Sequence, residues 1–202
     1  MYLICLTNYI HDLMIKKITK KKWKEAQEAE APFHQYSMEE GLRLYGFSYS
    51  NHFRYLDIPE DLGYRTIIEV GCAGFPALNW RKNYKGIVIE PLHTETLKTI
   101  CKEKNILWIK EPVEELDMPK CDELWLFNVM QHIQDPELFI EKCKESANVI
   151  KWFEPIDYPV CVYHPHTFSR EDFIRWFGHT QIYKDFVPHF HDAICSYGIW
   201  KK

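Results

Sequence analysis

The segment that most constrains this fold spans residues 66–76 and reads TIIEVGCAGFP. Its first five residues, Thr66 to Val70, predict a buried β-strand, because β-branched side chains suit a strand that is packed on both faces. The strand ends at Gly71 and Gly74, which permit a sharp turn and let a ligand lie against bare backbone. A strand followed by such a turn is typical of ligand sites in doubly wound α/β folds, although on this evidence a purely structural turn stays open.

Two acidic residues accompany the turn. Glu69 stands just before the first glycine, where a negative charge disfavours a pyrophosphate and favours a cationic group, such as the amino group of a methionine moiety. Glu90 ends a second short apolar strand, about twenty residues after the glycines, where α/β nucleotide sites place a carboxylate on ribose hydroxyls. A carboxylate can accept hydrogen bonds from both hydroxyls at once. The alternative for Glu90 is a solvated charge at a strand end.

With these motifs the sequence resembles class I S-adenosylmethionine-dependent methyltransferases. The resemblance rests on residues 69–74 (EVGCAG), on Glu90, and on residues 122–137 (DELWLFNVMQHIQDPE), which are similar to the fourth strand and following turn of that family. It covers residues 66–155 and, beyond them, only the layout of the chain. The sequence departs from the family at Ala73, near which many relatives carry a third glycine, so the path of the methionine-binding turn stays open.

The resemblance implies an α/β fold with a Rossmann-like, seven-stranded, mostly parallel sheet, an antiparallel C-terminal hairpin and an N-terminal helical lid. We expect residues 1–60 to form the lid, with a charged helix at 16–30, and residues 61–202 to form the methyltransferase domain of one compact unit. Residues 32–61 are too irregular to assign. Strands are expected at 66–70, 86–91, 105–110, 122–127, 148–153, 181–187 and 193–200. Helices are expected at 77–84, 94–104, 136–147 and 170–177, the last two capped by Asp135 and Ser169.

The resemblance also implies the residues that bind the cofactor, S-adenosyl-L-methionine. The methionine half is assigned to Glu69, Gly71 and Gly74, the ribose to Glu90, the adenine to Val113 and Glu114, and the sulfonium side to Asn128 and Val129. Further contacts are expected from Cys72, Ala73, Pro91 and Leu92. Pro112 stands where many relatives carry Asp, so a solvent-facing role for Glu114 stays open.

Histidines supply the candidate catalytic residues. His132 follows the fourth strand and can accept a proton near neutral pH, and in the family this position is often near the sulfonium and the substrate. The alternative is a helix-entry histidine that bonds to backbone. His166 is the second candidate base. The pairs His164/His166 and His189/His191 could converge on a metal, but no carboxylate or cysteine pattern accompanies them, so we expect no metal.

Composition narrows the classes of partner. The net charge of −4 over 202 residues argues against a dedicated nucleic-acid binder, which carries a basic excess. The seven cysteines form no CxxC pair and predict reduced side chains in a cytoplasmic protein. The apolar stretch at 2–6 is too short to span a membrane, so no membrane partner is expected.

The sequence therefore predicts a methyltransferase that aligns an acceptor for in-line displacement and removes the proton of a hydroxyl. A small-molecule acceptor, such as a sugar, is expected, because residues 128–131 read NVMQ and not the Asn-Pro-Pro-Tyr type motif of amino-directed nucleic-acid methyltransferases. The alternatives are another reaction of the same cofactor, a non-catalytic cofactor-binding protein, and a nucleic-acid methyltransferase. The oligomeric state is not predicted.

Overall fold

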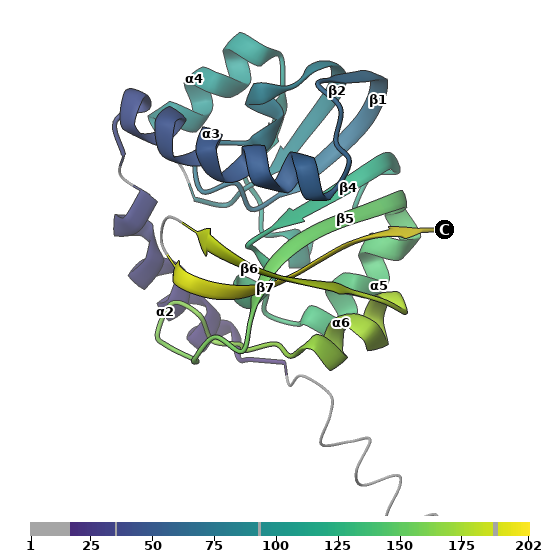
Figure 1. Cartoon of the computed structure of the whole chain (residues 1–202). Helices are drawn as coiled ribbons and strands as arrows, with labels where there is room; N and C mark the ends of the chain where they lie inside the picture. The colour runs from purple at the N-terminus through teal and green to yellow at the C-terminus, as the bar shows by residue number, and fades with distance from the viewer. Residues whose placement is uncertain (1–16, 35, 93, 188–189) are drawn as a thin grey trace, which may run out of the picture.

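Seven strands form one sheet within the described residues of this computed structural model, which are 17–34, 36–92, 94–187 and 190–202 (Figure 1). The strands are β1 (Asp61–Val70), β2 (Lys82–Ile89), β3 (Leu107–Ile109), β4 (Cys121–Phe127), β5 (Ala147–Ile156), β6 (Gln181–Val187) and β7 (Phe190–Lys201). Their order is β3-β2-β1-β4-β5-β7-β6, with β1 to β5 parallel and β7 antiparallel to β5 and β6. The expected Rossmann-like sheet and its antiparallel C-terminal hairpin are confirmed.

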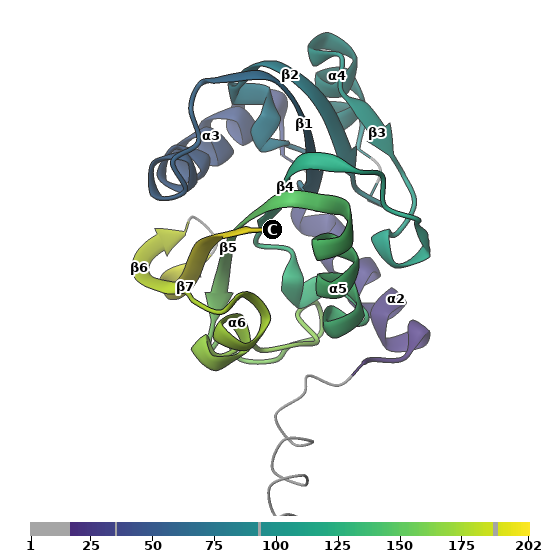
Figure 2. The same cartoon turned by 90° about the vertical axis from the view of Figure 1, so that its right-hand side faces the viewer.

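Helices cover both faces of the sheet. They are α2 (Lys20–Glu30), α3 (Met38–Tyr55), α4 (Glu95–Lys104), α5 (Pro136–Ser146) and α6 (Arg170–Phe177), with the single turns η1 (Ala31–His34), η2 (Ala77–Trp80), η3 (Val113–Glu115) and η4 (Met130–His132). Figure 2 shows α3 and α4 on one side of the sheet and α5 and α6 on the other. No helix among those described is long and apolar enough to cross a membrane.

The two cores follow from the alternation of side chains along the strands. Ile67 and Trp125 pack in the core under α3 and α4, whereas Ile68 and Leu126 pack in the core under α5 and α6. The central strands are therefore buried on both faces, which explains their nearly continuous apolar sequences.

Helix α2 lies at the carboxyl edge of the sheet and is tied to the loop after β4. The Ile18 N–H donates to the Gln134 carbonyl (3.0 Å), and the Gln134 side-chain amide donates back to the Ile18 carbonyl (3.1 Å). The Trp23 indole N–H donates to the His132 carbonyl (2.9 Å). These contacts hold an N-terminal helix against the ends of the parallel strands.

Two local expectations are wrong because strand pairing overrides the local pattern. Residues 82–84 were expected to be helical but belong to β2, where Tyr84 pairs with Arg65 of β1. Residues 154–156 were expected to be loop but extend β5, because β7 pairs with them as far as Ile156 opposite Ile194.

The unassigned stretch 32–61 contains the long helix α3, whose start is capped by the Ser37 hydroxyl accepting from the Glu40 N–H (3.2 Å). The glycines in this helix obscure its pattern, because glycine disfavours helices. Gly41 is needed all the same, since a Cβ there would overlap the ring of Phe75.

Candidate active site

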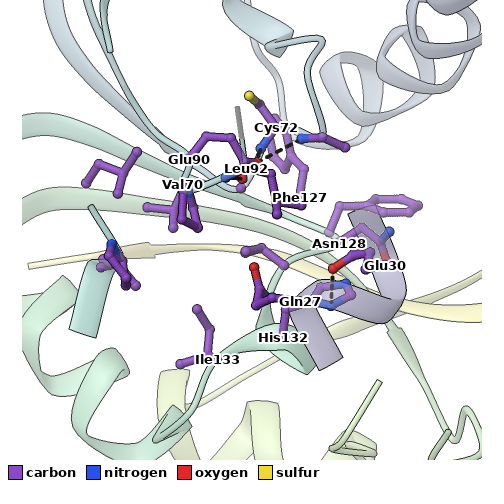
Figure 3. Close-up of a pocket in the computed structure, with 18 of the residues that line it drawn as sticks. Gln27, Glu30, Val70, Cys72, Glu90, Leu92, Phe127, Asn128, His132 and Ile133 are labelled. Atoms are coloured by element: carbon purple, nitrogen blue, oxygen red, sulfur yellow. Dashed lines mark hydrogen bonds and ion pairs between the residues drawn. The ribbon is translucent and has the colours of Figure 1, made fainter. Parts of the chain in front are cut away.

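A cavity of ≈ 1080 Å³, including space open to solvent, lies at the carboxyl ends of β1, β2, β4 and β5 beneath α2 and α3 (Figure 3). Small-molecule sites in proteins occupy about 300–1,000 Å³, and open parallel sheets bind ligands at this edge. Eleven of the fourteen site residues expected from the sequence line it, namely Gly71, Cys72, Ala73, Glu90, Pro91, Leu92, Val113, Glu114, Asn128, Val129 and His132.

The glycine turn after β1 forms one wall of the cavity. Gly71 (φ 68°), Ala73 (φ 49°) and Gly74 (φ 89°) all adopt left-handed backbone conformations, so the chain reverses tightly here. Gly71 lies so close to Val129 of the loop after β4 that a Cβ would overlap that side chain. The turn therefore brings bare backbone to the cavity, whereas Gly74 lies beside Thr94 and does not line it.

We expect Gly71→Ala to destabilise the fold by about 2–5 kcal/mol, of which ~1–2 is left-handed strain and ~1–3 is overpacking against Val129. Gly63→Ala is the matched control, because Gly63 has φ 60° but nothing within 4 Å of the added Cβ. Urea unfolding should show only the strain cost of about 1–2 kcal/mol in the control. Equal losses in both variants would contradict the close contact with Val129.

Glu90 organises the turn through its carboxylate (Figure 3). One oxygen, Oε2, accepts from the N–H groups of Cys72 (2.9 Å) and Ala73 (3.1 Å), and the other, Oε1, accepts from the Leu92 N–H (2.9 Å). The side chain is buried, which excludes the alternative of a solvated charge. These three bonds fix the carboxylate at the wall of the cavity, which it lines.

Glu69 does not lie in the cavity, contrary to the expectation from the sequence. It is fully buried and accepts from the Ala77 N–H (2.7 Å) and the Leu78 N–H (3.2 Å) at the start of η2. Burial raises its pKa to about 8, although the two backbone N–H groups act in the opposite direction. The structure thus gives Glu69 the role of capping η2, in place of the expected contact with a cationic ligand group.

The wall expected to meet the adenine comes from η3. Val113 is buried and Glu114 is half-buried, and Glu114 Oε1 accepts from the Gln134 N–H (2.7 Å). Burial raises the pKa of the Glu114 carboxyl. Glu114 therefore lines the cavity with its carboxylate held by the loop after β4.

The loop after β4 is held by a carboxylate that the sequence analysis missed. Glu154 of β5 is fully buried, and its Oε1 accepts from the N–H groups of Val129 (2.8 Å) and Met130 (3.2 Å). Asn128 adopts φ 59°, and its N–H donates to the Phe153 carbonyl (2.8 Å). The neighbouring strand β5 thus fixes the backbone that presents Asn128 and Val129 to the cavity.

His132 pairs with a lid carboxylate that the sequence analysis also missed. Its Nδ1 lies 3.0 Å from Oε2 of Glu30 on α2 and 3.1 Å from the Tyr163 carbonyl (Figure 3). Both neighbours are acceptors, so Nδ1 carries a proton. Burial, the largest single effect, lowers the pKa of His132, but Glu30 and the Tyr163 carbonyl together raise it above its ordinary value.

The second candidate base, His166, also lies outside the cavity, contrary to the expectation from the sequence. It is buried beside Phe168 and bonds to the Ile133 backbone, and burial lowers its pKa to about 4. The ring of His164 lies 4.8 Å from that of His132, and burial also lowers its pKa to about 4. In the expected pair His189/His191, His189 and the side chain of His191 lie outside the described part of the structure.

Comparison with known proteins places the fold. No protein-family model and no curated protein matches the sequence. Among solved structures, the N-methyltransferase NodS from Bradyrhizobium japonicum WM9, in complex with S-adenosyl-L-homocysteine, superposes with a TM-score of 0.67 at 11% identity, covering 88% of this chain and 98% of that chain. Coclaurine N-methyltransferase, bound to N-methylheliamine and S-adenosyl-L-homocysteine, gives 0.52 at 11% identity and covers 87% and 68%. The chain therefore has the fold of class I S-adenosylmethionine-dependent methyltransferases.

Proposed function

We propose that this protein transfers the methyl group of S-adenosyl-L-methionine to a hydroxyl of a small-molecule acceptor. The observation that carries the proposal is that one cavity contains both the turn organised by Glu90 and the Glu30–His132 pair. The first is the arrangement that binds a nucleoside, and the second is a base oriented by a carboxylate. Residues 1–60 are proposed as the lid of this site and residues 61–202 as the methyltransferase domain.

The residues present fit this cofactor. The cavity is lined by three carboxylates, Glu30, Glu90 and Glu114, together with His132, and no lysine or arginine lines its described walls. This charge suits a cofactor that carries an ammonium and a sulfonium group and disfavours phosphate-rich substrates such as nucleic acids. We propose that the carboxylate of Glu90, which lines the cavity, binds the ribose, that Val113 and Glu114 meet the adenine, and that Asn128 and Val129 face the sulfonium.

The cofactor supplies a methyl group that is already activated on its sulfonium, so the protein mainly positions the acceptor. Because Nδ1 of His132 donates to Glu30 and the Tyr163 carbonyl, Nε2 of the neutral ring is the atom that can accept the hydroxyl proton. The Glu30 carboxylate then stabilises the imidazolium that forms.

Calorimetric titration with S-adenosylmethionine and S-adenosylhomocysteine tests the proposal, and we expect binding of both ligands in the micromolar range. Incubation with an acceptor pool, followed by mass spectrometry, then separates methyl transfer from breakdown of the cofactor. Absence of binding by either ligand would leave a Rossmann-like scaffold with another use. Binding without turnover on any acceptor would favour a non-catalytic cofactor-binding protein.

A further inference from the structure

The α3 side of the cavity forms an aromatic compartment that no cofactor contact explains. Five residues of α3 lie on one helical face and line the cavity, namely Leu44, Tyr45, Ser48, Tyr49 and His52. Opposite them, Phe127 ends β4 and Phe153 lies near the end of β5. The rings are packed together: Tyr49 lies 6.1 Å from Phe127, and His52 stacks on Phe153 at 3.9 Å.

His52 is the polar group in this compartment whose hydrogen bonding is incomplete. It is only 4% exposed, and its Nδ1 is buried without a hydrogen-bond partner in the described part of the chain. A buried polar atom left unpaired costs free energy, so such atoms are normally paired in a functional complex. Burial lowers the pKa of His52 to about 3, so the ring is neutral in the working range of pH.

The compartment provides no charged partner for a substrate. None of its seven residues carries a charge at neutral pH. Of the carboxylates elsewhere in the cavity wall, Glu30 is paired with His132, and Glu90 binds backbone N–H groups of the turn. Aromatic walls of this kind favour the face of a flat ring, because aromatic pairs gain energy beyond the burial of area alone. These properties indicate that the compartment binds a substrate with an uncharged ring system.

The base also discriminates between kinds of hydroxyl. A phenolic hydroxyl has a pKa of about 10, whereas water, a guide to an aliphatic hydroxyl, has a pKa of about 15.7. The pKa of His132 is raised above its ordinary value and therefore lies closer to that of a phenol than to that of an aliphatic hydroxyl. Proton transfer to His132 is therefore much easier from a phenol than from a sugar.

Building on the proposed function, we propose that the acceptor is an uncharged aromatic compound with a phenolic hydroxyl for methylation and a second hydrogen-bonding group that pairs with Nδ1 of His52. The hydroxyl proton goes to Nε2 of His132, the acceptor oxygen forms the new bond to the methyl carbon, and sulfur keeps the electron pair of the bond that breaks. The proposed acceptor is therefore a flat ring and not the sugar expected from the sequence.

Three matched probes test this inference in the presence of S-adenosylhomocysteine: 2,7-dihydroxynaphthalene, 2-naphthol and the saturated decahydro-2-naphthol. We expect the dihydroxy probe to bind roughly three- to tenfold more tightly than 2-naphthol, through the added hydrogen bond. The saturated probe should bind roughly tenfold more weakly than 2-naphthol, because it lacks an aromatic face. His52→Phe should abolish the preference for the second hydroxyl while keeping the ring stack, and Ser50→Ala, at an exposed position of α3, should change nothing.

Equal binding of the saturated and aromatic probes would overturn the ring preference. A dihydroxy preference that survives in His52→Phe would overturn the role of His52, and the two naphthols on the wild-type protein test the ring even if that variant does not fold. Binding of S-adenosylhomocysteine with none of the probes would reject this inference and leave the proposed function standing. Binding of the naphthols without S-adenosylhomocysteine binding would reject the proposed function and support the aromatic compartment alone.

Discussion

Replacing Glu90 with glutamine is expected to weaken the binding of S-adenosylhomocysteine roughly 10- to 100-fold, because a hydrogen bond to a charged group contributes about 1.5–3 kcal/mol. The native carboxylate accepts three backbone N–H groups and lines the cavity. A glutamine amide has a single acceptor oxygen, and its NH₂ group would face N–H groups of the turn or of Leu92. The variant is therefore expected to lose both the proposed ribose contact and the organisation of the turn.

Calorimetry at fixed ionic strength measures this loss, with Glu103→Gln as the matched control. Glu103 lies exposed on α4, and its replacement removes the same charge without touching the turn. Thermal unfolding should show that Glu90→Gln remains folded, with a melting temperature lowered by a few degrees at most. Wild-type affinity in Glu90→Gln would remove the main support for the cofactor assignment.

The position of Glu90 could be predicted from the sequence, because it depends only on the parallel pairing of β1 and β2. Parallel strands end at the same edge, so the acid after β2 must lie beside the turn after β1. Glu69 could not be placed in the same way. Its position near the end of β1 correctly predicts that it lies near the carboxyl edge of the sheet. However, side chains alternate along a strand, and the side chain of Glu69 points into the core. There it accepts hydrogen bonds from two N–H groups of η2.

The remaining site residues depend on contacts between distant parts of the chain. Glu30 stands in a run of charges that indicates a solvated helix face, and only the docking of α2 against η4 brings it to His132. Glu154 was expected in the loop after the fifth strand, whereas pairing with β7 extends that strand through this residue. Such pairings involve tertiary structure, which local propensity does not encode.

The Glu30–His132 pair gives the second large effect, and it is expected to appear in the pH dependence of methyl transfer. Only the neutral imidazole can act as a base, so the rate should rise with pH through the raised pKa of His132. Replacing His132 with glutamine should lower kcat roughly 10²- to 10⁴-fold, the usual contribution of a general base. Glu30→Gln removes the charge that raises the pKa, so its rate profile should move to lower pH and reach a lower plateau.

The same pair links the docking of the lid to pH. Because the folded-state pKa of His132 is raised, its contribution to stability is fully present below the unfolded pKa of about 6.5 and is lost as pH rises through the folded value. Glu30→Gln should therefore lose stability at acidic pH and approach the wild-type protein at alkaline pH. Glu28→Gln, at an exposed position of the same helix, is the control.

NMR titration of the His132 imidazole in the wild-type protein, Glu30→Gln and Glu28→Gln provides a readout that needs no acceptor. We expect a pKa above the ordinary histidine value in the wild-type protein and in Glu28→Gln, and a clearly lower pKa in Glu30→Gln, because burial then acts without its counter-charge. Burial lowers the pKa of the neighbouring His164 to about 4, so we expect its resonances to be distinguished from those of His132 by their titration range. If His132 titrates identically in all three proteins, Glu30 does not orient the base, and α2 covers the site without taking part in proton transfer.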